Sequence, residues 1–264
     1  MNLASLDASI LGPAFAAGLV VLATHVPLGR EVLKRGIVFI DLAVAQIAGL
    51  GVIVAHTLGW EAHGWGTQLA AVASALAGAC LLGWMERRWG KFQEALIGAA
   101  FVLAATAGIL LLAENPHGGE RLRELLVGQI LWVTWGQLLP AVLVSAFVLS
   151  VWFCLGARRV GRVGFYALFA LAVTASVQLA GVYLVFASLI IPALAGIGQS
   201  AGRALLVGYA AGGAGYALGL VLSALLDLPG GAVIVWGIAA MALLGRALCG
   251  ALARAAEGGY PASD

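Results

Sequence analysis

The chain has 264 residues, of which 62% are hydrophobic and only 10% are charged, and its formal net charge is +2. Soluble domains carry about 25% charged residues, so this composition excludes an ordinary water-soluble protein and predicts a polytopic membrane protein. The small positive charge is explained by anchoring at the cytoplasmic face and gives no support to a nucleic-acid partner. No linker or charged run divides the sequence, so we expect residues 1–264 to form a single transmembrane domain.

Apolar stretches long enough to cross a bilayer recur along the chain, since a spanning helix needs about 20 such residues. The candidates in chain order are 10–28, 37–58, 67–85, 94–113, 137–156, 164–179, 180–198, 204–224 and 231–251. The region 164–198 is too short for two full helices and a loop and too long for one. Gly181 and Pro192 interrupt it, which predicts a broken or short helix there. The predicted fold class is all-α, with eight or nine transmembrane helices.

Basic residues fall almost entirely on one side of this map. With the amino terminus outside, twelve of the fourteen Lys and Arg residues lie in predicted inner loops: Arg30, Lys34, Arg35, Arg87, Arg88, Lys91, Arg158, Arg159, Arg162, Arg203, Arg246 and Arg254. Only Arg121 and Arg123 fall outside. Because cytoplasmic loops carry an excess of Lys and Arg, we expect the amino terminus outside and the carboxyl terminus inside.

Asp41 is the clearest ionisable residue within an apolar stretch, and such residues are functional candidates because each costs at least about 2.5 kcal/mol at mid-membrane. His25 ends the first stretch at a similar depth, and the short connection predicts that the two helices are antiparallel neighbours. A contact between His25 and Asp41 would then either lock the two helices or form part of a cation path or its gate. Gln46 either lines that path or bonds a neighbouring helix.

The other three histidines, His56, His63 and His117, all fall on the predicted outer side, with glutamates nearby in sequence. Imidazole and carboxylate groups suit divalent cations, but these residues show no fixed ligand spacing. They are either ordinary surface histidines or a loose outer site that receives a cation.

Two features near the end of the chain concern movement and packing. Pro192 interrupts an apolar helix, where it either acts as a hinge or only shapes packing. The inner loop after it contains Gly196, Gly198, Gln199, Gly202 and Arg203. This loop either docks against a cytosolic partner or is an ordinary connection.

A row of glycines in the eighth stretch follows helical spacing. Gly208, Gly212, Gly215 and Gly219 share one stripe, which lets another backbone approach closely. The stripe predicts packing either within the subunit or at a dimer interface.

The sequence contains no Gly-x4-Gly-Lys-Ser/Thr loop for nucleotide phosphates. Lys34 and Lys91 are its only lysines, and neither lies in that context. The chain therefore cannot hydrolyse ATP by itself, and we do not expect it to be an enzyme.

Four segments carry motifs in a defined order: QEALIGAAFVLAATAGILLL (93–112), ELLVGQILWVTWGQLL (124–139), GVYLVFASLIIPALA (181–195) and GLVLSALLDLPGGAVIV (219–235). Together with KRGIVFIDLAVAQ in the second stretch, they resemble the permease subunits of zinc, manganese and iron ABC importers, the ABC-3 family. The resemblance implies a fold like that of these permeases and of the vitamin B12 importers. It also implies a homodimer in a bacterial inner membrane, cytosolic ATPase subunits that hold the ATP, and an extracytoplasmic metal-binding protein.

In this family the acidic residue matching Asp41 is commonly followed four positions later by His. Here Ala45 stands at that position and Gln46 follows it, so the metal is left open. The resemblance implies no tightly bound cofactor, only a transported divalent ion. Two alternatives remain: a permease for a metal chelate such as a siderophore or cobalamin, and a non-transport membrane enzyme, for which only His25 with Asp41 comes close to a ligand cluster.

The distribution of basic residues generates a test of topology. Single cysteines placed near Arg88 and Arg159 should react with an impermeant thiol reagent only in permeabilised cells, because both positions lie in predicted inner loops. A cysteine near His117 should react in intact cells. Labelling near Arg88 from outside in intact cells would show that the orientation is wrong.

Overall fold

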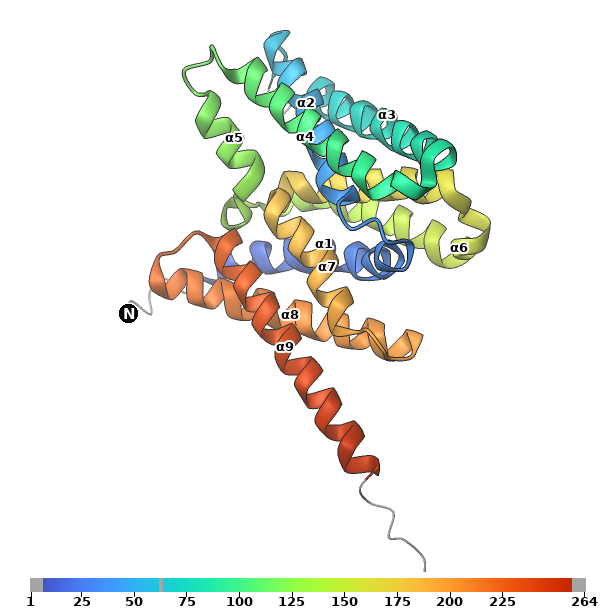
Figure 1. Cartoon of the computed structure of the whole chain (residues 1–264). Coiled ribbons are helices and arrows are strands. Elements are labelled where there is room, and N and C mark those ends of the chain that lie inside the picture. The colour runs from blue at the N-terminus through green and yellow to red at the C-terminus, as the bar shows by residue number, and fades with distance from the viewer. Residues whose placement is uncertain (1–6, 62–63, 258–264) are drawn as a thin grey trace, which may run out of the picture.

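The computed structural model describes residues 7–61 and 64–257, without the side chains of residues 157–158 and 249–257. All regular elements in this part of the chain are helical, which confirms the predicted all-α class. The α-helices are α1 (Ala8–Arg35), α2 (Ile40–Thr57), α3 (Trp65–Trp89), α4 (Gln93–Leu112), α5 (Gly118–Val127), α6 (Trp135–Ala180), α7 (Val182–Ala195), α8 (Ala201–Leu226) and α9 (Gly230–Glu257). Two short 3-10 turns, η2 (Gly90–Phe92) and η3 (Ile130–Trp132), complete the set (Figure 1).

Seven helical segments of the described chain are long and apolar enough to cross a membrane. One of them, Trp65–Leu112, comprises α3 and α4, and α7 is a shorter apolar helix of 14 residues. Each apolar stretch expected from the sequence coincides with a helix, two of them sharing α6. The prediction of a multi-pass membrane protein is therefore confirmed.

The region around residues 164–198 contains the predicted break. The long helix α6 is interrupted by non-helical backbone at Gly156 and Gly161, so it crosses as two segments, Trp135–Gly156 and Arg159–Ala180. At its end, Gly181 has a φ of 77° and separates α6 from the short helix α7. The broken, short helix expected from Gly181 is confirmed, and α7 continues through Pro192.

Helices α1 and α2 are not the packed neighbours that the short connection predicts. Helix α1 continues to Arg35 and ends at a left-handed Gly36 (φ 69°), after which the chain turns away. Helix α1 packs against α6, α7 and α8, whereas α2 packs against α3 and α4 and rises away from α1 (Figure 1). A short connection therefore does not make an antiparallel pair here, because the Gly36 cap changes the direction of the chain.

The glycine stripe of α8 packs within the chain. A Cβ at Gly208 or Gly212 would meet Val26 or Leu22 of α1, and a Cβ at Gly215 or Gly219 would meet the backbone of α9 at Ile238 or Ile234. All four glycines are buried in this single chain. Of the two interpretations left open by the sequence, packing within the subunit is confirmed for this face, and a dimer interface along the stripe is excluded.

Two glycines bring distant parts of the chain into backbone contact. Gly128 follows α5 with a φ of 71°, and Gly181 lies between α6 and α7. A Cβ on Gly181 would collide with the backbone of Gly128, and a Cβ on Gly128 would collide with the Ala180 carbonyl. The end of α5 is therefore seated directly against the start of α7.

This contact predicts that Gly181→Ala is destabilising by about 2 kcal/mol or more, because the new methyl group adds an overlap to an unfavourable positive φ. The measurement is the melting temperature of the purified protein in detergent. Gly136→Ala is the matched control, since a Cβ there meets nothing within 4 Å. Equal melting temperatures for Gly181→Ala and the unchanged protein would contradict the contact.

Candidate functional site

Asp41 lies in the first turn of α2 and is 0% exposed. Neither of its carboxylate oxygens has a hydrogen-bond partner. A buried charge without a partner is costly, and in a membrane-spanning helix such a group is a functional candidate by default. Asp41 is therefore the residue around which we describe the site.

His25 is also 0% exposed and lies in α1. Its Nδ1 atom is 2.9 Å from the Val21 carbonyl oxygen and 3.0 Å from Thr24 Oγ1. Because a carbonyl oxygen can only accept, we assign the hydrogen to Nδ1, which leaves the lone pair on Nε2. Nε2 is buried without a partner. A backbone carbonyl that fixes one ring nitrogen while the other stays free is the arrangement found at metal-binding histidines.

The predicted direct contact between His25 and Asp41 is absent. The unpartnered atoms include Nε2 of His25 and both oxygens of Asp41, so no hydrogen bond joins the two side chains. The physical reason is the divergence of α1 and α2 after Gly36. A buried pair that locks the two helices is thereby excluded in this conformation, and the role of each residue in a cation path stays a prediction.

Gln46 is half-buried and lines a small cavity beneath α5. The cavity has a volume of about 10 Å³, roughly enough for a single water molecule. Leu122 and Leu125 of α5 line it from one side, and Ala45 and Gln46 of α2 from another. Gln46 therefore lines a small, partly open cavity, and its role as a path-lining residue stays a prediction.

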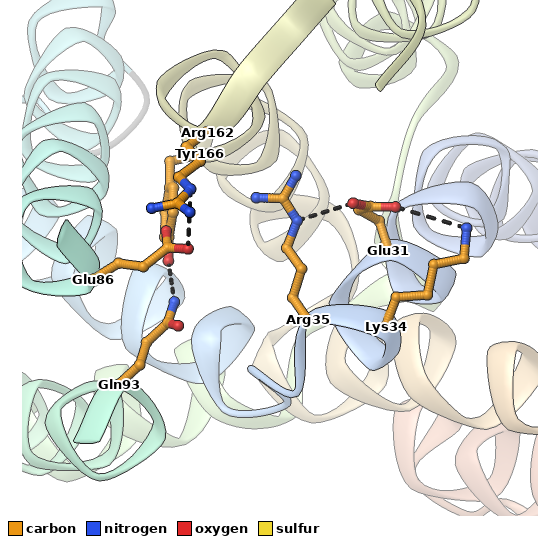
Figure 2. A network of polar contacts seen from close by, with 7 residues as sticks. All are labelled: Glu31, Lys34, Arg35, Glu86, Gln93, Arg162 and Tyr166. Atoms are coloured by element: carbon orange, nitrogen blue, oxygen red, sulfur yellow. Dashed lines mark hydrogen bonds and ion pairs between the residues drawn. The ribbon is translucent and has the colours of Figure 1, made fainter. Parts of the chain in front are cut away.

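A polar network surrounds the start of α2 and connects α1, α3, α4 and α6 (Figure 2). Arg35 Nε donates to Glu31 Oε1 at 3.0 Å, and the guanidinium lies 4.1 Å from the centroid of the Phe165 ring. Lys34 lies 3.8 Å from the same Glu31 carboxylate. The network thus fixes the end of α1 against α6, where the chain turns toward α2.

The second part of the network joins α3, α4 and α6. Arg162 Nε is 3.8 Å from Glu86 Oε1, and Gln93 Nε2 donates to the Tyr166 hydroxyl at 2.6 Å; Figure 2 shows these four side chains gathered in one group. Glu94, next to Gln93, accepts the Phe39 N–H of the α2 start at 3.1 Å. The second oxygens of Glu86 and Glu94 are buried without partners.

Sequence reasoning missed these contacts of Glu86, Gln93 and Tyr166. Glu94 was part of a recognised motif, but the motif gave it no partner. The available signal was the position of two glutamates at the inner ends of apolar stretches, beside the basic residues of the turn between them. Their partners lie in other helices, so no spacing along the chain could identify them.

Two of the three outer histidines, His56 and His117, lie in the described part of the chain, at the end of α2 and just before α5. His117 is exposed and precedes α5, with Nδ1 3.6 Å from Glu120 Oε2. His56 lies in the last turn of α2, and His63 falls outside the described residues. Within residues 7–61 and 64–257, no group of three or more His, Cys, Asp or Glu side chains is arranged to hold a metal ion. The outer receiving site stays a prediction.

Pro192 is buried in α7, one turn after Ser188. The Ser188 hydroxyl donates to the Leu184 carbonyl at 2.7 Å, so the Tyr216 hydroxyl, 2.9 Å away, is placed to donate to Ser188 Oγ. This bond ties α7 to α8 on the amino-terminal side of Pro192. The hinge role of Pro192 is not tested by this contact and stays a prediction.

The loop between α7 and α8 is held from both sides by arginines. Arg30 of α1 donates to the Ala201 carbonyl at 2.8 Å, and Arg246 of α9 donates to the Leu194 carbonyl at 3.2 Å. Gly202 and Arg203 lie in the first turn of α8 and are exposed. Gly196 is buried against Ala204, whereas Gly198 is exposed, so the surface of this segment is formed by residues after Gly196.

Comparisons with known proteins give a family and two similar structures. The family model of the ABC 3 transport family matches residues 7–160 and 154–249. No curated protein matches the chain. PsaBC from Streptococcus pneumoniae, solved in complex with a Fab, is similar with a TM-score of 0.72 and 20% identity over 89% of this chain and 90% of that chain. An inward-facing transporter described as being of the metal-chelate ABC type is similar with a TM-score of 0.63 and 20% identity, over 94% and 88%. At this identity the two structures show the fold alone.

Proposed function

The chain belongs to the ABC 3 transport family, and from this premise we propose that it carries a divalent transition-metal ion, zinc, manganese or iron, along a path that passes Asp41. Membership confirms the family predicted from the motifs and, with it, the predicted function as the permease subunit of an ABC importer of metal ions. The chain is the membrane-spanning, non-catalytic subunit of that system.

The unpaired carboxylate of Asp41 is the observation that carries the proposal. A passing cation would supply the charge that this buried group lacks in the described structure. The free Nε2 of His25 and the amide of Gln46 are the further groups that we assign to the path. Carboxylate and imidazole together suit borderline divalent cations such as these metals.

A metal chelate is the second candidate cargo, and the similarity to the metal-chelate type transporter favours it. The groups that we assign to the path support a bare ion instead, because carboxylate and imidazole are groups that bind divalent ions directly. We therefore propose the ion as cargo.

The proposed assembly is a homodimer of this chain with two cytosolic ATPase subunits, which bind the ATP, and an extracytoplasmic metal-binding protein. We propose no tightly bound cofactor. The lack of a nucleotide-binding loop in the sequence supports separate ATPase chains. The bacterial inner membrane and its bilayer are the proposed location, with the amino terminus outside.

The distribution of loops supports this orientation. The α3–α4 turn, which carries Lys91 and follows Arg88 of α3, and the α7–α8 loop, which is followed by Arg203 in the first turn of α8, lie on one side of the molecule, to the right in Figure 1. Helix α5 and the α8–α9 turn lie on the opposite side. Basic residues concentrated on the first side are typical of a cytoplasmic face.

The loop of residues 196–203 is the proposed contact with the ATPase. Gly202→Trp should lower metal-stimulated ATP hydrolysis by the assembled complex without lowering the amount of protein in the membrane, because Gly202 is exposed and a Cβ there meets nothing within 4 Å. Gly198 is a poorer test position, since its φ of 84° makes any substitution strained.

Gly119→Trp is the matched control, because Gly119 is equally open but lies in α5 on the opposite side. ATP hydrolysis is measured in proteoliposomes that contain the complete complex. Equal stimulation in Gly202→Trp and Gly119→Trp would sink the assignment of this loop.

Asp41→Asn should lower metal uptake by about tenfold or more, the loss that follows when a charge contact worth about 1.4 kcal/mol is removed. Asparagine keeps the volume of the side chain, so insertion and dimer formation should survive. The measurement is uptake of Mn²⁺ and Zn²⁺ by cells, normalised to permease in the membrane.

Asp227→Asn is the control for the loss of one negative charge. Asp227 is exposed at the end of α8 with a φ of 51°, a conformation that asparagine also tolerates. Normal uptake in Asp41→Asn would eliminate the role of Asp41 in transport.

A further inference from the structure

The amino terminus of α2 receives its cap from another helix. The first N–H groups of an α-helix lack partners within the helix, and a side chain at the N-cap commonly accepts from one of them. Phe39 is the N-cap of α2 and has no such side chain. Instead, the Phe39 N–H donates to Glu94 Oε1 of α4 at 3.1 Å.

Asp41 lies in the same turn, two residues after Phe39. Aspartate in the first turn of a helix is attracted by the unpartnered N–H groups and by the positive end of the helix dipole. Nevertheless, both oxygens of Asp41 are without a hydrogen-bond partner although the side chain is fully buried. Two carboxylates thus lie at one helix start, and only one of them accepts from the backbone.

Glu94 is held in place from α6. The residue before it, Gln93, is the first of α4 and donates to the Tyr166 hydroxyl at 2.6 Å. Figure 2 shows Gln93 reaching toward Tyr166, beside Glu86. The start of α4 is therefore bonded to α6 as well as packed against α2, so this bond restrains the residue before Glu94 from a side other than α2.

From these contacts we infer that Glu94 is the positioning residue of the transport path: by accepting the Phe39 N–H, it fixes the start of α2 and leaves the Asp41 carboxylate free for the cation. This inference rests on the proposed role of Asp41. In this role Glu94 contributes an oxygen acceptor at the right distance from Phe39, and its negative charge is not required. Without that acceptor, the start of α2 loosens and Asp41 turns toward the vacant N–H group.

Two conservative variants separate the acceptor from the charge. Glu94→Gln keeps an oxygen at the same reach but removes the charge, whereas Glu94→Asp keeps the charge but is one methylene too short to reach Phe39. Uptake of Mn²⁺ by cells is measured for each, normalised to permease in the membrane. The purified complex is assayed in parallel for basal ATP hydrolysis and for metal transported per ATP hydrolysed.

Glu94→Gln should transport within about twofold of the unchanged protein, and Glu94→Asp should lose up to about tenfold, the upper end of what the loss of one ordinary hydrogen bond costs. Basal ATP hydrolysis should be unchanged in both, so that metal transported per ATP falls only in Glu94→Asp. Glu86→Gln is the control and should behave like the unchanged protein. Glu86 also has a buried oxygen without a partner, but its carboxylate lies near Arg162.

The opposite pattern, with Glu94→Asp active and Glu94→Gln inactive, would overturn the inference and make the charge of Glu94 the important property. Equal activity or equal loss in the two variants would overturn it as well. Asp41→Asn is measured in the same assay. Normal transport by Asp41→Asn would overturn the proposed role of Asp41. Loss of transport in Asp41→Asn together with normal transport in Glu94→Asp would overturn only the role given to Glu94.

Discussion

Inside a bilayer, each backbone N–H and C=O group needs a partner from the protein, because lipid supplies none. This constraint explains the all-helical fold and also the way in which the helices are interrupted. At the break between α6 and α7, the Gly181 N–H donates to the Val177 carbonyl at 2.8 Å, and the break is covered by the backbone at Gly128. At this break, the chain itself supplies the hydrogen-bond partner and the covering backbone.

Buried polar side chains need partners for the same reason, and this need draws attention to the start of α2. Arg35, Glu31 and their neighbours place charge at helix ends, where pairing and water keep its cost low. Asp41 has neither pairing nor exposure. Glu94 differs from it, since one of its oxygens receives a backbone N–H. Asp41 is thus a buried carboxylate with no partner for either oxygen, the feature on which its proposed contact with a passing ion rests.

Hydropathy was sufficient to predict the apolar helices, although not the amphipathic helix α5, because the length of an apolar run is a local property. The short helix α7 was predictable for the same reason, from Gly181 and the limited length of the region. Contacts between helices were not predictable in this way. The expected neighbours α1 and α2 diverge because one residue, Gly36, turns the chain. Glu94 and Phe39 are 55 positions apart in the sequence. Their hydrogen bond could therefore be identified only from the folded structure.

The glycine contacts of α8 have a mechanical consequence. Helices α8 and α9 are in direct backbone contact, because a Cβ at Gly215 or Gly219 would meet the backbone of Ile238 or Ile234, so these two helices cannot slide past each other without overlap. Side chains of α1 fill the space against Gly208 and Gly212, and α7 is bonded to α8 through Ser188 and Tyr216. Helices α2, α3 and α4 pack mainly among themselves and meet this group mainly through α6. The turn at Gly36 is the covalent link between α1 and α2, and Asp41 lies just after it, in the group formed by α2, α3 and α4.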